Sequence, residues 1–393
     1  MANDLTINQI YTIVNEVNKQ ATGGNLTVID TSSFITVGQT ILKCGYDTVM
    51  QSISQVLSKT IFSTRPYNRK FPSLMVTNQQ YGNHVRKLQV VDKEFEKDER
   101  YELNDGLSVD MYKVKKPELL QTNFYGEEVF QKTLTRFKDQ IDVAFSSPDE
   151  FGRFIVMILQ NVNDMIEQAH ENISRMILCN FIGGKIAKNN GVIHLLTEYN
   201  EMLGRTGDPA PEPYTIDVIY SPEVFPSFVK WAYARIGSLS DLLTERSTLY
   251  HINVDNKPVQ RHTPKKNQKL FMLNSFINNV NTSVLSSVYN DGKLSIGAFE
   301  SVNFWQNITN PTSIRITPSV LENDGTVKKG AEINNSSIIG CIFDDEALGY
   351  TTVNNWTATT PLNTAGGYTN THWHFTDRYW NDFTENGIVF CLD

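Results

Sequence analysis

Cysteine, long apolar runs and clustered positive charge are all scarce in this chain of 393 residues. The four cysteines show no CxxC spacing, so the sequence indicates neither a disulfide framework nor a structural zinc site. No apolar run approaches the roughly 20 residues that a membrane helix needs, and we expect no membrane contact. The first residues lack the basic and apolar regions of a signal peptide, which predicts that the protein is made and kept in a cytoplasm.

The charge balance and the missing motifs exclude further classes of function. A formal net charge of −8 argues against a surface that grips nucleic acid. The basic stretch from Lys257 to Lys269 contains prolines and amides, so we interpret it as an exposed loop for an acidic neighbour, with DNA as the alternative. The sequence has no GxxxxGK[ST], GxGxxG, HExxH or GxSxG motif. We therefore expect a protein that is not an enzyme and that needs no cofactor.

One histidine pair still has to be considered as chemistry. His372 and His374 fall on the same side of an extended segment, and Asp377 or Cys391 could add a third metal ligand. A packed aromatic patch is the simpler interpretation of this pair. The alternative, a hydrolase that uses these histidines with the acids around Asp344, predicts a stoichiometric metal. Successive acids on a strand point to opposite faces, so we interpret those acids as a turn.

The N-terminal segment predicts a short amphipathic helix from Leu5 to Ala21, which Gly23 ends. A helix of this length cannot bury its own apolar face, so that face must pack on this chain or on a neighbouring subunit. The face is formed by Ile10, Ile13, Val14 and Val17, which we predict to be contact residues. A second amphipathic stretch extends from Phe34 to Phe62.

The region from Thr64 to Tyr125 is dense in charges of both signs. Two partly alternating runs, Val85 to Val91 and Leu107 to Val114, predict a long two-stranded hairpin with a polar tip. A hairpin alone is only marginally stable in water, so we expect it to lie across a partner surface. A solvated insertion is the alternative. The predicted contact residues of the tip are Asp92, Lys93, Glu94, Glu96, Lys97, Asp98, Glu99 and Arg100.

A long helix follows the charged region. Ser147 as a cap, Pro148 in the first turn and two acids after it form a strong helix start. Apolar residues then hold one continuous face to Ile182, and Gly183 with Gly184 predicts the end. Roughly 35 residues give a helix about 50 Å long. We expect it to be a spine for other elements.

The rest of the chain mixes short helices and strands, which indicates an α+β unit. We predict a helix from Ile193 to Leu203, a strand from Tyr214 to Tyr220 and a helix that begins at Ser221. Strands are predicted from Ile314 to Val320 and from Ile338 to Phe343. An apolar strand extends to the C-terminus and implies that this terminus is buried in a sheet.

Three local sequences carry a resemblance to a known family. They are Ile339-Gly-Cys-Ile-Phe-Asp-Asp-Glu-Ala-Leu-Gly349, Asn303-Phe-Trp-Gln306 and Asn381-Asp-Phe-Thr-Glu-Asn-Gly387. With the order of the predicted elements, they resemble the major capsid proteins of tailed bacteriophages, whose fold is shared with encapsulin shells. The resemblance implies an α+β capsid fold with an N-terminal arm, an extended β-hairpin loop, a peripheral domain with the spine helix, and an axial domain. The implied divisions are 1–62 (arm and following helix), 63–125 (extended loop), 126–190 (peripheral), 191–355 (axial) and 356–393 (return to the peripheral domain).

The resemblance also implies a function and partners. The chain would assemble with itself into hexamers and pentamers that form an icosahedral head around double-stranded DNA, without specific DNA binding. A separate scaffolding protein, a portal and decoration proteins are the other expected partners. The virion is the expected location, after assembly in the cytoplasm of the host bacterium. The alternatives are an encapsulin-like shell and a phage head-associated binding protein.

Overall fold

The structure is a computed structural model of the whole chain. It describes residues 7–23, 27–44, 48–49, 52–53, 68–76, 85–91, 98–112, 114, 116, 118–207, 210–254, 259–287 and 299–393.

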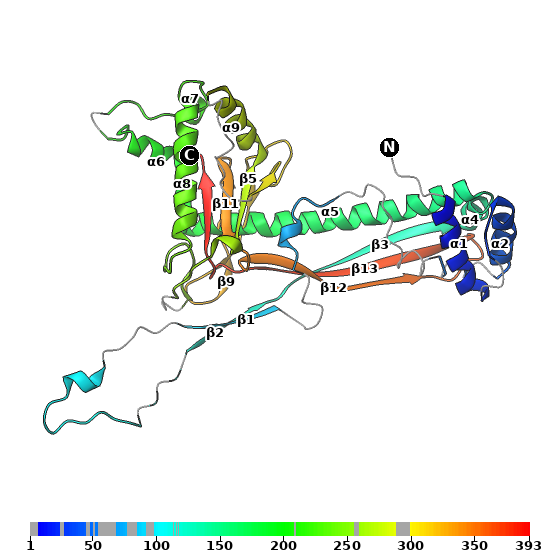
Figure 1. The fold of residues 1–393 in the computed structure, drawn as a ribbon, viewed down its shortest axis with the longest axis horizontal. Helices are drawn as coiled ribbons and strands as arrows, with labels where there is room; N and C mark the ends of the chain where they lie inside the picture. Colours follow the sequence, from blue (N-terminus) through cyan, green and yellow to red (C-terminus); the bar gives the residue numbers. More distant parts are fainter. Residues whose placement is uncertain are drawn as a thin grey trace.

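A long helix and a long sheet form the body of the molecule. Helix α5 (Pro148–Lys188) has 41 residues and is about 60 Å long. It runs along an antiparallel sheet of order β12-β13-β3, formed by Leu348–Thr359, Tyr368–Asn381 and Gly126–Phe137 (Figure 1). Alternate residues of β13 are buried, among them Thr371, Phe375 and Asp377. This period of two gives the sheet one covered face and one open face.

The predicted start of α5 is confirmed, but its predicted end is wrong. The Ser147 side chain accepts a hydrogen bond from the Glu150 amide, and Pro148 lies in the first turn. The helix continues through Gly183 and Gly184 and ends at Lys188. A Cβ atom on Gly184 would lie 2.4 Å from Cζ of Phe383. These glycines therefore let other elements approach the helix closely, rather than ending it.

At one end of α5, the described residues form three helices. They are α1 (Ile7–Thr22), α2 (Thr31–Lys43) and α4 (Lys138–Ala144) (Figure 1). Helix α2 begins with a capping box, in which Asp30 and Ser33 exchange hydrogen bonds. The apolar sides of α1 and α2 pack with Phe151 and Ile155 of α5 in one buried cluster. The predicted N-terminal helix is confirmed.

The other end of α5 meets a second sheet, of order β4-β14-β11-β5-β6. Its central strand, β11 (Ile338–Asp344), is buried at every position, as expected of a strand that is covered on both faces. Helices α8 (Phe225–Leu242) and α9 (Asn274–Ser287) share its apolar cluster (Figure 1). The remaining strands of this sheet are β4 (Val192–His194), β5 (Gln268–Leu273), β6 (Phe299–Val302) and β14 (Gly387–Cys391).

Two predictions for this part of the chain are wrong. The segment predicted as a strand from Tyr214 to Tyr220 contains the short helix α7 (Ile216–Ile219). Ser221 does not cap α8, because residues 221–224 form turns and the helix begins at Phe225 with Pro226 in its first turn. The predicted helix near residue 193 is confirmed as α6 (Leu195–Met202).

A two-stranded ribbon projects away from the body (Figure 1). Strand β1 (Val85–Val90) pairs in antiparallel register with β2 (Leu119–Phe124), so that Val90 lies opposite Leu119. The first predicted strand is confirmed, but the second, Leu107 to Val114, is not: the described residues of that segment form no strand. The tip contains the short helix η2 (Glu99–Glu102).

Several small elements complete the fold. They are η1 (Pro72–Leu74), η4 (Lys265–Asn267), β7 (Ile314–Ile316), β8 (Ser319–Leu321), β9 (Val327–Lys329) and β10 (Ile333–Asn335). Strand β7 pairs with β10, and β8 pairs with β9. Within the described residues, no helix has the length and apolar character needed to cross a membrane.

The chain passes between the two large sheets twice near its C-terminus. Residues 345–347 connect β11 of the five-stranded sheet to β12 of the three-stranded sheet, and residues 382–386 connect β13 back to β14. The terminal strand β14 pairs with β11 and β4. The terminus is buried in a sheet, as predicted.

Candidate assembly surface: the extended hairpin and its root

The tip of the extended hairpin presents both charged and apolar side chains. Of the eight predicted contact residues, Asp98, Glu99 and Arg100 are described, and they lie at the start of η2. Asp92, Lys93, Glu94, Glu96 and Lys97 lie outside the described residues. The Asp98 carboxylate forms an ion pair with Arg100 at 2.6 Å, on an exposed surface where such pairs contribute little stability.

Sequence reasoning emphasised the charges of the tip and missed its apolar residues. Tyr101, Met111 and Tyr112 are 84%, 82% and 81% exposed. Large exposed apolar side chains that gather on a protruding segment are typical of a surface that another molecule covers. In the sequence they appear only as scattered residues between charges, and their exposure becomes visible only in the fold.

The root of the hairpin alternates in the direction of its side chains. Arg86, Leu88 and Val90 of β1 are exposed, whereas Lys87 and Gln89 between them point toward the body. This is the period of two that a strand imposes. The hairpin therefore has an inner face that contacts its own subunit and an outer face that is open.

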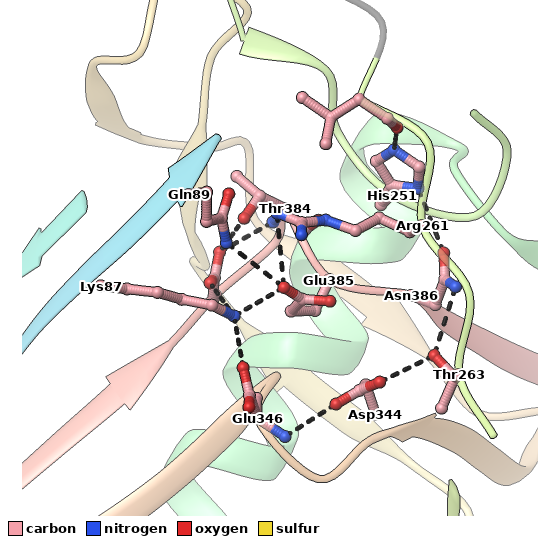
Figure 2. A network of polar contacts seen from close by, with 12 residues as sticks. Lys87, Gln89, His251, Arg261, Thr263, Asp344, Glu346, Thr384, Glu385 and Asn386 are labelled. Carbon is pink, nitrogen blue, oxygen red and sulfur yellow. Dashed lines mark hydrogen bonds and ion pairs between the residues drawn. The ribbon is translucent and has the colours of Figure 1, made fainter. Parts of the chain in front are cut away.

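Lys87 lies among three carboxylates of the body, and Figure 2 shows its contacts with two of them, Glu346 and Glu385. Its Nζ atom is 2.6 Å from Glu385, 3.1 Å from Asp382 and 3.1 Å from Glu346. Asp382 and Glu385 are almost fully buried. Burial alone would lower the pKa of Lys87, but the three carboxylates together raise it above its ordinary value. We call Lys87, Glu346, Asp382 and Glu385 the root cluster.

We call residues 345–347 and 382–386, which connect the two large sheets, the two crossings. Their backbone positions these carboxylates. The Asp382 amide donates to the carbonyl of Ala347, and the Asp344 amide donates to that of Asn386 at 3.0 Å. Each crossing thus holds the other in place. Gln89 Nε2 also donates to Glu385, at 3.3 Å, and Arg261 forms an ion pair with the same carboxylate at 3.4 Å.

A chain of buried hydrogen bonds continues from the root cluster into the body (Figure 2). The Asn386 amide donates to Thr263 Oγ1, and Thr263 donates to Asp344 at 2.8 Å. Asn386 Oδ1 lies 3.1 Å from Nδ1 of His251. Burial, with the nearby carboxylate of Glu385, raises the pKa of Asp344 to about 6. The junction is therefore polar, buried and titratable.

The predicted contact residues of the N-terminal arm lie inside the subunit. Ile10, Ile13, Val14 and Val17 are at most 5% exposed and pack in the cluster that α1 forms with α2 and α5. Gly152 of α5 makes room for one of them, because a Cβ atom there would lie 2.8 Å from Cδ1 of Ile10. A contact with a neighbouring subunit through these four side chains would require the arm to leave this cluster.

The candidate metal ligands do not converge. His372 lies 3.0 Å from Gln131 Nε2, and His374 stacks on Trp356 with ring centroids 3.9 Å apart. Asp377 is buried and faces His170 of α5 at 3.2 Å. Cys391 lies in the other sheet. Among the described residues, no group of three or more His, Cys, Asp or Glu side chains could hold a metal ion.

The structure also places the four cysteines and part of the basic stretch. Cys179, Cys341 and Cys391 are buried free thiols, as predicted, whereas Cys44 is exposed. Burial raises the pKa of Cys179 to about 12, which keeps this thiol protonated and unreactive. In the described part of the basic stretch, Lys265 forms an ion pair with Asp241 at 2.6 Å.

Two solved structures share the fold of this chain. The structure is similar to a chain in the capsid structure of Staphylococcus phage Andhra, with a TM-score of 0.51, 10% identity, and coverage of 85% of this chain and 87% of that one. It is also similar to a chain in the structure titled head fiber and inner core protein gp22 of native bacteriophage P68, with a TM-score of 0.54, 12% identity and the same coverages. At these identities the likeness concerns the fold alone.

The family follows from the sequence. A model of the Phi29-like phage major capsid protein family matches residues 10–391. The chain therefore belongs to this family, and its role is that of a structural capsid protein. This confirms the predicted class and the α+β capsid fold. No curated protein matches the sequence significantly.

Proposed function

We propose that this protein is a subunit of the virion shell that assembles with copies of itself into closed rings of five and six. The rings would build the icosahedral head around double-stranded DNA, with a portal, a separate scaffolding protein and decoration proteins as partners. Assembly in the host cytoplasm belongs to the same proposal. Family membership favours a phage head over an encapsulin-like shell or a head-associated binding protein, and it favours a structural over an enzymatic role.

The observation that carries the proposal is the extended hairpin. A ribbon that projects from the body, with exposed Leu88 and Val90 at its root and Tyr101 and Met111 at its tip, leaves apolar surface in water if the subunit is alone. A neighbouring subunit in a ring would cover that surface. The mixed charges of the tip would then select the register and orientation of the contact more than its strength.

The experiment is a deletion of the hairpin tip, residues 92–105, with particle formation examined by negative-stain electron microscopy. The proposal expects closed particles or free rings from the unchanged chain, and a folded, soluble variant that forms no closed shell. The matched control is a replacement of the same residues by a Gly-Ser linker of equal length, which keeps the spacing but removes the side chains. Normal shells from both variants would contradict the proposed role of the hairpin.

A further inference from the structure

We propose that Lys87 is a positioning residue that sets the direction of the extended hairpin, through the three carboxylates of the root cluster. The inference rests on the proposed function, because the direction of the hairpin decides where a neighbouring subunit is met. With Lys87 in place, the hairpin is held at one angle to the body. Without Lys87, the hairpin can rotate about its root.

The hairpin joins the body sheet through a very short connection. A single residue, Tyr125, separates β2 of the ribbon from β3 of the body sheet, and the two strands belong to different sheets. Tyr125 is 72% exposed. Gly126 follows at a point of close backbone approach, where a Cβ atom would lie 2.4 Å from the Tyr379 carbonyl oxygen. Rotation about this short connection would move the whole ribbon while leaving β3 in place.

The β2 strand borders unfilled space. A groove of about 770 Å³ lies between β2, the spine helix and the β8–β9 hairpin, and is lined among others by Thr122, Phe124, Met176 and Leu321. Protein interiors are otherwise closely packed, so this groove leaves the β2 side of the root without tight support. Packing alone therefore does not fix the angle of the ribbon.

The β1 strand, by contrast, is held to the body by polar contacts. Lys87 is only 18% exposed and reaches three carboxylates that come from both crossings between the sheets. Ion pairs that are shielded from water depend strongly on geometry, and Asp382 and Glu385 are almost fully buried, whereas the Glu346 side chain is 66% exposed. The two buried anions therefore give the cation one preferred position. Gln89 adds a hydrogen bond to the same Glu385. The root is thus held by directional polar contacts at β1 and borders a groove at β2.

The test uses double electron–electron resonance spectroscopy on the full chain. The distance between a label on the hairpin and a label on the body reports the direction of the hairpin. Spin labels are placed on Ser108→Cys in the tip and Glu223→Cys in the body, both exposed positions, in a Cys44→Ser background. Labelled chains are diluted into unlabelled chains, so that only distances within one chain are read. The unchanged root should give one narrow distance distribution.

Lys87→Met keeps the stem of the side chain but removes the charge, and should broaden the distribution at least twofold. Lys87→Arg should restore a narrow distribution, because the cation is kept. The matched control is Arg86→Met, the exposed neighbour on the outer face of β1, which should leave the distribution unchanged. A narrow, unshifted distribution in Lys87→Met would overturn the proposal.

A second variant addresses the cost of leaving buried carboxylates without their cation. Lys87→Met combined with Asp382→Asn removes the cation together with one anion, and should fold with a broad distribution. If neither variant folds, Lys87 serves the folding of the subunit and its positioning role is refuted. The distances report on the single chain, so they remain readable even if electron microscopy shows no shells and the proposed function fails.

Discussion

The two ends of the spine helix α5 are built from different interactions. Its N-terminal end packs with α1 and α2 through apolar side chains, with Val14, Val17 and Phe34 fully buried. Its C-terminal end meets the junction of the two sheets, where Lys185 is buried and donates to the Tyr250 carbonyl at 2.6 Å. Burial lowers the pKa of this lysine to about 7. The first end is held mainly by apolar burial, whereas the second combines apolar burial, with Phe181 and Ile182 fully buried, with oriented polar contacts.

The two ends of α5 therefore have different roles: one contributes to the stability of the subunit, and the other to the direction of the extended hairpin. Apolar burial is strong but non-directional, so the N-terminal helices contribute to the folding of the subunit. Polar contacts depend on angle and on charge, so the junction can fix the orientation of the hairpin that is attached to it. Three predictions test this division, in order of decreasing effect.

The largest effect is expected from Val14→Asp. A carboxylate placed in the buried apolar cluster has no cation beside it, and the free energy of unfolding should fall by about 3–5 kcal/mol. Chemical denaturation followed by circular dichroism measures the change. Thr12→Asp, on the exposed side of the same helix, is the control and should change stability little. A folded Val14→Asp subunit that only fails to assemble would instead place this face against a neighbour.

The second prediction concerns the pH dependence of the junction. The pKa of Asp344 is raised in the folded state, so its stabilising contribution is complete below about pH 4 and is lost as the pH rises through about 6. Asp344→Asn cannot titrate. We compare the unfolding free energy of Asp344→Asn with that of the unchanged chain. From pH 4 to pH 7, the value for the variant minus the value for the unchanged chain should increase by up to about 3 kcal/mol. A difference that stays constant over this range would show that Asp344 titrates normally.

The smallest effect is expected from alanine at a helical glycine. Gly184→Ala places a methyl group against the Phe383 ring and should destabilise the subunit by about 1–3 kcal/mol. Gly237→Ala in α8 is the matched control, because a Cβ atom there meets nothing within 4 Å. It should stabilise the subunit by about 0.4–1 kcal/mol. Equal melting temperatures for the two variants would mean that Gly184 is not a packing contact.

Local patterns in the sequence predicted the elements whose formation depends on neighbours along the chain. The apolar face around Val14, the cap at Ser147 and the strand at Val85 all follow from such patterns. Gly183 and Gly184 were misinterpreted because their roles depend on distant residues, Ile316 for Gly183 and Phe383 for Gly184. The alternation after Leu107 is a strand pattern without a partner strand in the described chain.

The candidate site shows the same limit more clearly. The tip was predicted from its charges, but the root cluster joins residues that are 298 positions apart, Lys87 and Glu385. No local pattern marks such a pair. In the sequence, Lys87 is only a charged residue within a predicted strand. Its role is seen only in the fold, where the two crossings bring three carboxylates to it.

The most direct test of the central claim is a cryo-electron microscopy map of the assembled particle in which the hairpin can be traced. The account predicts closed shells in which the hairpin of each subunit lies on a neighbouring subunit, with Leu88 and Tyr101 covered and Lys87 still within the root cluster. Shells in which the hairpin folds back on its own subunit, or projects into solvent without a contact, would contradict it.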